Sequence, residues 1–198
     1  MNKKIPKTPD AVQKGFTLIE MLVVTGIIVL VSSAILANSG RLGGQFILDN
    51  FAYDLALTLR EAQQFGISVQ SFGGNFNVAY GVHFDASTPT SYVLFADAVT
   101  PNGLYDTGEL VQSYTITRGF KISSICATAN DVSPEDCTLT KLDVLFKRPE
   151  PDALISKNDA SCILSLPNCQ AISRIIMLAP RGNTKSIVIP ANGQMSVQ

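Results

Sequence analysis

The stretch "KGFTLIEMLVVTGIIVLVSSAILA", from Lys14 to Ala37, decides how this chain is organised. From Phe16 to Ala37 it has 22 residues, and Glu20 is the only charged side chain among them. A helix of that length rises about 1.5 Å per residue and reaches about 33 Å, enough to cross the hydrocarbon core of a bilayer. The stretch therefore predicts a membrane-spanning helix that contains one carboxylate.

The charges on either side of this run indicate its orientation. One acid, Asp10, precedes the run, and the first charge after it is Arg41. Four cations also precede it: Lys3, Lys4, Lys7 and Lys14. Because positive charge stays on the cytoplasmic side, the N-terminus is predicted in the cytoplasm and the C-terminal part outside.

Two simpler interpretations leave part of the pattern unexplained. A secretory signal peptide has an apolar core of about 7–15 residues, so this run is too long, although "AILANS" offers a poor cleavage site. A plain anchor explains the length but not Glu20, because a carboxylate at membrane depth costs about 2.5–3.5 kcal/mol. The run has no Lys, Arg or His, so the partner of Glu20 must be a lipid group or another chain.

Composition limits the remaining possibilities. The 198 residues predict one domain plus an appendage, with 16% charged residues, a net charge of −1 and a mean hydropathy of +0.23. The two basic clusters, "FKRPEP" and "APRGNTK", are short, so nucleic-acid binding is unsupported. There is no phosphate-binding loop, and the one histidine, His83, lies in a strand-like context without a recognisable catalytic set, so no enzyme is predicted.

The segment "KGFTLIEMLVV" (Lys14 to Val24) closely resembles the N-terminal signature of type IV prepilins and type II secretion pseudopilins. The resemblance implies cleavage of the Gly15–Phe16 bond by a prepilin peptidase and N-methylation of Phe16. It maps the glutamate of the family onto Glu20. The partners that it implies are the peptidase, other pilins or pseudopilins of one filament, and an inner-membrane assembly platform.

Electrostatics gives Glu20 a role in that setting. Cleavage leaves an α-amino cation at Phe16, and two opposite charges about 4 Å apart attract by about 4 kcal/mol at an effective dielectric near 20, before desolvation is subtracted. Glu20 of one subunit and Phe16 of the next can neutralise each other and set the register of a filament. A structural filament subunit is therefore predicted. The alternative is a membrane-tethered binding module: an adhesin, a DNA-uptake protein or a secretion-substrate receptor.

Beyond the membrane a second helical half is predicted. The glycines of "NSGRLGGQ" (38–45) are expected to bend or melt the helix locally. After them, apolar residues at spacings of three and four predict one buried face: Leu48, Phe51, Leu55, Leu59, Ala62 and Val69. The expected organisation is a cleaved leader (1–15), a transmembrane helix (16–37), the second half of the spine (38–70) and a β-rich domain (71–198).

From Ser71 onward the pattern changes to short β segments. Strands are predicted in "FNVAYGVHFD", "SYVLFAD", "ELVQSYTIT", "FKISSIC" and "KLDVLFKRP", then two around an Arg-Gly-Asn turn and a last short one. The predicted fold is α+β and pilin-like, with a helical spine packed on an antiparallel sheet domain. "LTLREAQQ", with Arg60 and Ala62, and the ending "SIVIPANGQMSV" resemble the GspH/FimT group of minor pilins and pseudopilins.

All four cysteines lie in two polar patches. Cys126 and Cys137 bracket one, and Cys162 and Cys169 bracket the other. An even count outside the cytoplasm favours disulfides, and the local pairing is favoured among the three possible connectivities. The spacings are far from those of a zinc site, and His83 is remote in sequence.

The segment "DAVTPNGLYDTGE" (97–109) is similar to a calcium loop. With Gly103 at the turn, Asn102, Asp106 and Glu109 fall on ligand positions, but Ala98 and Thr100 stand where acids are expected. The alternative is an acidic hairpin turn without a metal.

Overall fold

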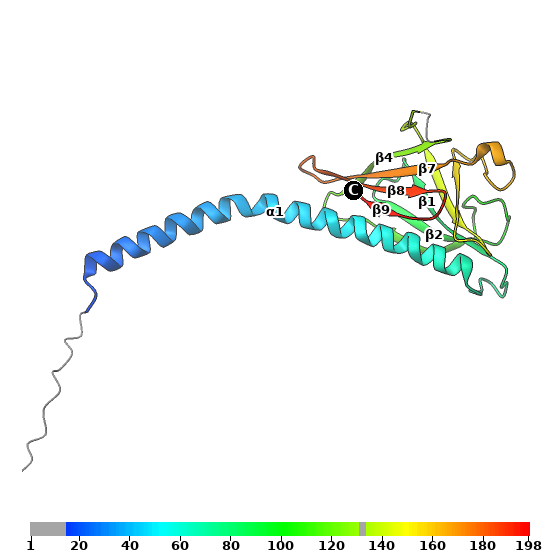
Figure 1. Cartoon of the computed structure of the whole chain (residues 1–198). Helices are drawn as coiled ribbons and strands as arrows, with labels where there is room; N and C mark the ends of the chain where they lie inside the picture. Colours follow the sequence, from blue (N-terminus) through cyan, green and yellow to red (C-terminus); the bar gives the residue numbers. More distant parts are fainter. Residues whose placement is uncertain (1–14, 131–133) are drawn as a thin grey trace, which may run out of the picture. The chain divides into compact units, whose positions relative to one another are not determined.

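The computed structural model describes residues 15–130 and 134–198, and within helix α1 it leaves the side chains of residues 38–43 undescribed. The leading lysines and Asp10, on which the predicted orientation rests, lie outside these residues. The chain divides into two compact units, the first ending at Leu42 and the second running from Gly43 to Gln198. Figure 1 shows one long helix followed by strands, which is the predicted α+β order.

Helix α1 (Leu18–Ile67) is one uninterrupted element of 50 residues. Of the two outcomes predicted for 38–45, a bend or local melting, melting is wrong, because α-helix continues through that segment. A glycine costs about 1 kcal/mol relative to alanine in a helix, but it keeps its N–H group and can adopt helical angles. No proline occurs in α1, so no hydrogen bond of the ladder is lost.

The second half of α1 buries one face in the outer domain. Leu48, Ala52, Leu55, Leu59 and Ala62 are at most 2% exposed. Their spacings of three and four place them on a single stripe, and burying one leucine fully contributes about 1.5–3 kcal/mol. The predicted face is confirmed except at two positions. Phe51 is only partly buried, and Val69 lies beyond the helix and is 67% exposed.

The described residues form two antiparallel sheets. Their orders are β3-β2-β1-β5-β6 and β4-β7-β8-β9. The strands are β1 (Ala79–Asp85), β2 (Ser91–Asp97), β3 (Leu110–Thr115), β4 (Lys121–Thr128), β5 (Lys141–Phe146), β6 (Ala153–Lys157), β7 (Ile172–Leu178), β8 (Thr184–Pro190) and β9 (Ser196–Val197). A single 3₁₀ turn, Leu166–Asn168, lies between β6 and β7.

Strand β6 is the one that the sequence analysis missed. It has five residues, follows Pro149 and Pro151, and lies just before a cysteine-bracketed loop. The segment is a strand because it pairs with β5, from Leu142 opposite Lys157 to Phe146 opposite Ala153. A strand this short carries too little periodicity to be recognised alone, so only its neighbour in the sheet defines it.

One hydrophobic core joins the helix to both sheets. Residues of α1 such as Leu55 and Leu59 belong to the same buried cluster as Val82 of β1 and Ile187 of β8. In Figure 1 the later half of α1 runs beside the strands. The helix lies very close to β5 at Gly66, where an added Cβ would lie 2.8 Å from the carbonyl carbon of Phe146 and still closer to its oxygen.

We expect Gly66→Ala to destabilise the outer domain by about 1–3 kcal/mol, because the helix must move away from the β5 backbone. The matched control is Gly44→Ala in the same helix, where an added Cβ meets no atom within 4 Å. That change should be neutral or stabilising by up to about 1 kcal/mol, as helix propensity predicts. Urea unfolding of the full chain in detergent, followed by tyrosine fluorescence, measures both. Equal effects at the two positions would contradict the close packing of α1 on β5.

Candidate functional site

The first turn of α1 is closed by a capping interaction. The Thr17 hydroxyl accepts the backbone N–H of Glu20 at 3.2 Å, and the Thr17 carbonyl accepts that of Met21 at 3.2 Å. Thr17 is therefore the N-cap, and Thr-x-x-Glu is the spacing of a capping box. The sequence analysis did not identify Thr17, although this spacing was visible in "TLIE".

Gly15 and Phe16 precede the helix in exposed, non-helical backbone. The Phe16 side chain is 74% exposed, and no atom lies within 4 Å of a Cβ added at Gly15. The Gly15–Phe16 bond therefore stands outside the hydrogen-bond ladder of α1 and is open to solvent.

The segment after this bond has the length and composition of a membrane span. Leu18–Ala37 has a mean hydropathy of 2.4, and none of it is buried within the protein. Two of its hydroxyls bond back to their own helix: Thr25 donates to the Met21 or Leu22 carbonyl, and Ser33 donates to that of Leu30. Glu20 is exposed and forms no ion pair with any described residue.

The loop between β2 and β3 is organised by two buried carboxylates. One oxygen of Glu109 accepts the N–H groups of Ala98, Val99 and Thr100 at 2.9–3.2 Å, and the other accepts that of Asp106 at 3.0 Å. The Glu109 side chain is fully buried. Backbone donors thus satisfy a carboxylate that would otherwise be costly to bury.

Asp97 has the same kind of environment at the start of the loop. Its two oxygens accept the N–H groups of Asn102 and Gly103, each at 3.0 Å. Burial raises the pKa of Asp97 to about 6; these two hydrogen bonds oppose the rise, and the nearby Glu109 adds to it.

These contacts bear on the three calcium-ligand candidates. Glu109 is occupied by amide donors, while the Asn102 amide donates to Asp106 at 3.0 Å and its oxygen accepts the N–H of Leu104 at 2.8 Å. A cation at Glu109 would have to displace these donors. The geometry therefore favours the acidic turn over a calcium loop.

The cysteines form two local bridges, Cys126–Cys137 and Cys162–Cys169, the pairing favoured from the sequence. Among the described residues, one group of three has ligand atoms close enough to share a metal ion: Cys126, Glu135 and Cys137. Two of these three side chains are joined in a disulfide, and the third, Glu135, forms an ion pair with Arg174, with Oε1 of Glu135 3.0 Å from Nε of Arg174. The cluster therefore offers no thiolate to zinc.

His83 has a partner that the sequence analysis missed. Its Nδ1 lies 2.7 Å from Asp143 Oδ1, and the same oxygen accepts the N–H of Tyr105 at 3.2 Å. Burial raises the pKa of Asp143, while the contact with His83 opposes the rise. The two residues are directly opposite in the β1–β5 register, which no local sequence signal reveals. Through these contacts Asp143 of β5 links His83 of β1 to Tyr105 of the β2–β3 loop.

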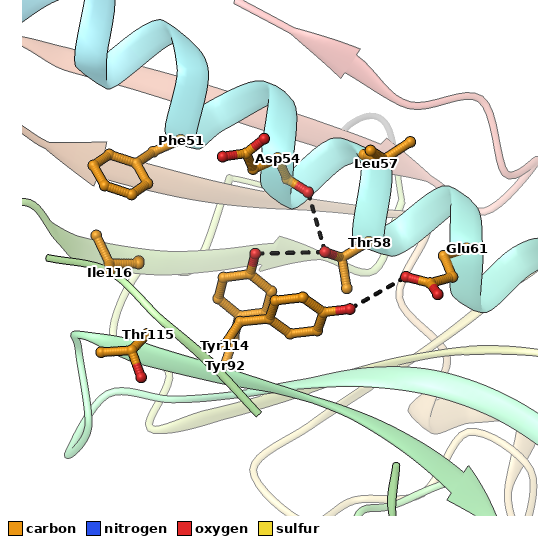
Figure 2. A pocket seen from close by; sticks show the side chains of 9 residues that line it. All are labelled: Phe51, Asp54, Leu57, Thr58, Glu61, Tyr92, Tyr114, Thr115 and Ile116. Atoms are coloured by element: carbon orange, nitrogen blue, oxygen red, sulfur yellow. Dashed lines mark hydrogen bonds between the residues drawn. The ribbon is translucent and has the colours of Figure 1, made fainter. Parts of the chain in front are cut away.

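A groove of about 310 Å³ lies between α1 and the β2–β3 edge. The rings of Tyr92 and Tyr114 stack there with centroids 5.0 Å apart (Figure 2). The Tyr92 hydroxyl is 3.5 Å from the Thr58 hydroxyl, and Tyr114 donates to Glu61 at 3.2 Å. Burial raises the pKa of Tyr92 to about 12. The sequence analysis did not identify this groove.

Comparison with known proteins gives one result. Residues 11–36 match the prokaryotic N-terminal methylation motif, a segment that contains Gly15, Phe16 and Glu20. No curated protein and no solved structure matches the chain. The motif supports the type IV pilin and pseudopilin class, whose members are structural rather than enzymatic. It also fits a protein anchored in the inner membrane by its N-terminal apolar helix.

We expect the Asp97 carboxyl to titrate near pH 6 instead of near 3.8. Because the folded-state pKa is raised, the contribution of Asp97 to stability is complete below about pH 3.8 and is lost as the pH rises through about 6. Carboxyl ¹³C NMR measures the titration directly. Asp136 is the control in the same spectrum, since hydrogen bonds from Thr138 lower its pKa. Titration of Asp97 at or below 3.8 would contradict the effect of burial.

Proposed function

We propose that this protein is a minor pilin or pseudopilin, a structural subunit of a type IV pilus or of a type II secretion pseudopilus. A prepilin peptidase cleaves it after Gly15, Phe16 becomes the N-methylated first residue, and α1 inserts among the helices of other subunits. In this proposal residues 1–15 are the leader, 16–37 the membrane and assembly segment, 38–70 the rest of the spine, and 71–198 the extracytoplasmic domain.

The observation that carries this proposal is the coincidence of three features in one short segment. The methylation motif covers residues 11–36, the bond after Gly15 is exposed ahead of the capped helix, and the apolar face that follows is uncovered. A buried soluble helix would not leave this surface open, and a simple anchor has no use for an exposed bond and a carboxylate one turn later.

The proposed assembly step pairs two charges from different subunits. Cleavage creates an α-amino cation at Phe16, and Glu20 has no counter-charge among the described residues. In an apolar environment each of these charges is costly alone, and their contact offsets part of that cost. Glu20 therefore acts as a positioning residue for the incoming subunit.

The runner-up is a membrane-tethered binding module, in which α1 is only an anchor. Its support is the exposed groove beside Tyr92 and Tyr114. The methylation motif favours the filament subunit, because an anchor needs neither processing after Gly15 nor a carboxylate at Glu20. The GspH/FimT-like features at Arg60, Ala62 and the C-terminus support a minor subunit within the filament class.

We expect N-terminal sequencing of the membrane-extracted protein to begin at Phe16, with a mass increase of one methyl group. Gly15→Leu should abolish this processing and leave the full-length chain in the membrane, because a bulky side chain replaces hydrogen at the cleaved bond. Gly26→Leu, a matched change within the helix, should be processed normally. A mature chain beginning near Asn38 would instead identify a secretory signal peptide.

We expect Glu20→Ala and Glu20→Gln to insert in the membrane and to be cleaved normally, because removing a charge lowers the insertion cost. Assembly should fall at least about tenfold, since the unpaired Phe16 amine costs well over 1.4 kcal/mol. Co-purification with the other filament subunits measures assembly. Ser33→Ala, whose hydroxyl bonds only to its own helix in the described structure, is the control. Wild-type incorporation of both Glu20 variants would contradict charge pairing and favour the anchor.

A further inference from the structure

Most edges of the two sheets are protected. The outer side of β6 bonds to other segments, with Gln170 donating to Ile155 at 3.1 Å and Ala153 donating to Ala191 at 2.7 Å. The edge of β4 is bridged at Ala127 by Asp136, and β9 has only two residues. Protected or short edges are the usual way in which proteins avoid unwanted strand pairing.

Strand β3 lacks this protection. It has the sequence LVQSYT, without a charge or a proline, and Leu110 and Val111 are 48% and 37% exposed. In the described part of the chain no segment hydrogen bonds to the side of β3 that faces away from β2. An uncharged six-residue edge of this kind can accept a further strand.

The register of β3 identifies the backbone groups that are free. Ile116 donates its N–H to the Thr90 carbonyl at 2.8 Å, so the backbone N–H and C=O groups of residue 116 point toward β2. In an antiparallel strand the backbone groups of alternate residues point toward the same neighbouring strand. The backbone groups of Tyr114 therefore also point toward β2, while those of Ser113 and Thr115 point outward. Two outward residues give an added strand a set of donors and acceptors.

The groove beside β3 gives such a strand a charge preference. Its lining includes Tyr114 and Thr115 of β3 and, from α1, Asp54 and Glu61 (Figure 2). Neither acid forms an ion pair with a described residue. Arg60 does not line this groove, although it lines a second groove around α1 together with Asp54. A side chain on the Tyr114 face of an added strand would lie on the side of the sheet where both acids line the groove.

We propose that β3 is a docking edge for an extended segment of a different protein, which adds as an antiparallel strand and places a lysine or arginine between Asp54 and Glu61. Tyr114 stacks on Tyr92 through one face, and its other face offers the cation a second favourable contact. A second copy of this chain fits less well, because pairing two β3 edges about a two-fold axis brings two pairs of carboxylates together. The inference does not rest on filament assembly, since it uses only residues of the second unit.

The test uses the full chain in detergent and two synthetic peptides, acetyl-Thr-Val-Lys-Val-Thr-amide and the same peptide with glutamate in place of lysine. Amide hydrogen exchange by NMR reports on Ser113 and Thr115. We expect the lysine peptide at millimolar concentration to slow exchange at both amides at least fivefold. The glutamate peptide should bind at least fivefold more weakly.

Variants test the charge preference and the strand pairing separately. The double variant Asp54→Asn/Glu61→Gln keeps the shape of the groove and should remove the preference for lysine. Its control, Glu150→Gln/Asp152→Asn, changes the net charge equally at exposed positions outside the groove and should keep the preference. Ser113→Pro removes one outward N–H without removing a bond to β2, and it should abolish binding while the Asp97 titration stays unchanged.

Each result supports or overturns the proposal. Slowed exchange at Ser113 and Thr115 with a lysine preference that the double variant removes supports it. Unchanged exchange with the lysine peptide overturns the docking edge, and equal binding of both peptides overturns the basic partner. Slowing of the same amides without peptide, increasing with protein concentration, would identify a second copy as the occupant and overturn the proposal.

Discussion

The burial of one stripe of α1 against the sheets is the interaction on which the outer domain depends. Leu55, Leu59 and Ala62 are fully buried, and they belong to the one core cluster that includes residues of both sheets. Gly66 continues this contact to the end of the helix, where its missing side chain lets α1 approach the β5 backbone. Without the helix, each sheet would expose an apolar face to water.

The same helix therefore meets two different environments. Its first half is apolar on all sides and uncovered, whereas its second half is apolar mainly on the face that contacts the sheets. A helix that is hydrophobic all round suits lipid or a bundle of similar helices, and an amphipathic one suits the surface of a globular domain. The proposed division between assembly segment and outer domain follows from this difference between the surroundings that suit the first half of α1 and those that suit the second half.

The carboxylates of the outer domain and the carboxylate of the apolar segment also differ in their surroundings. Glu109 and Asp97 are buried in the outer domain, and backbone N–H groups of their own loop hold both oxygens of each. Asp143 has His83 and the Tyr105 amide. Glu20, in the most apolar part of the chain, has no described cation beside it. An acid without a described partner, in the part of the chain where charge is most costly, supports the proposed pairing of Glu20 with another subunit.

Local signals in the sequence were sufficient for much of this protein. The 22-residue apolar run, the signature around Gly15 and Glu20, and the alternation in most strands each lie within a short window. The bracketing cysteines favoured the local pairing for the same reason, because their partners are 11 and 7 residues apart. The apolar run and the strands follow from composition and periodicity, which the chain carries before it folds, whereas the signature is identified by its resemblance to that of prepilins.

Tertiary structure alone decided what depends on distant partners. Strand β6 exists through its pairing with β5, and the His83–Asp143 contact requires the β1–β5 register. The helix continues through the glycines at 38–45, where local propensity favoured a break. The groove at Tyr114 and the open edge of β3 arise where α1 and the first sheet meet. The reason is physical: register and packing are set by groups far apart in the sequence, and no local pattern specifies which of them will meet.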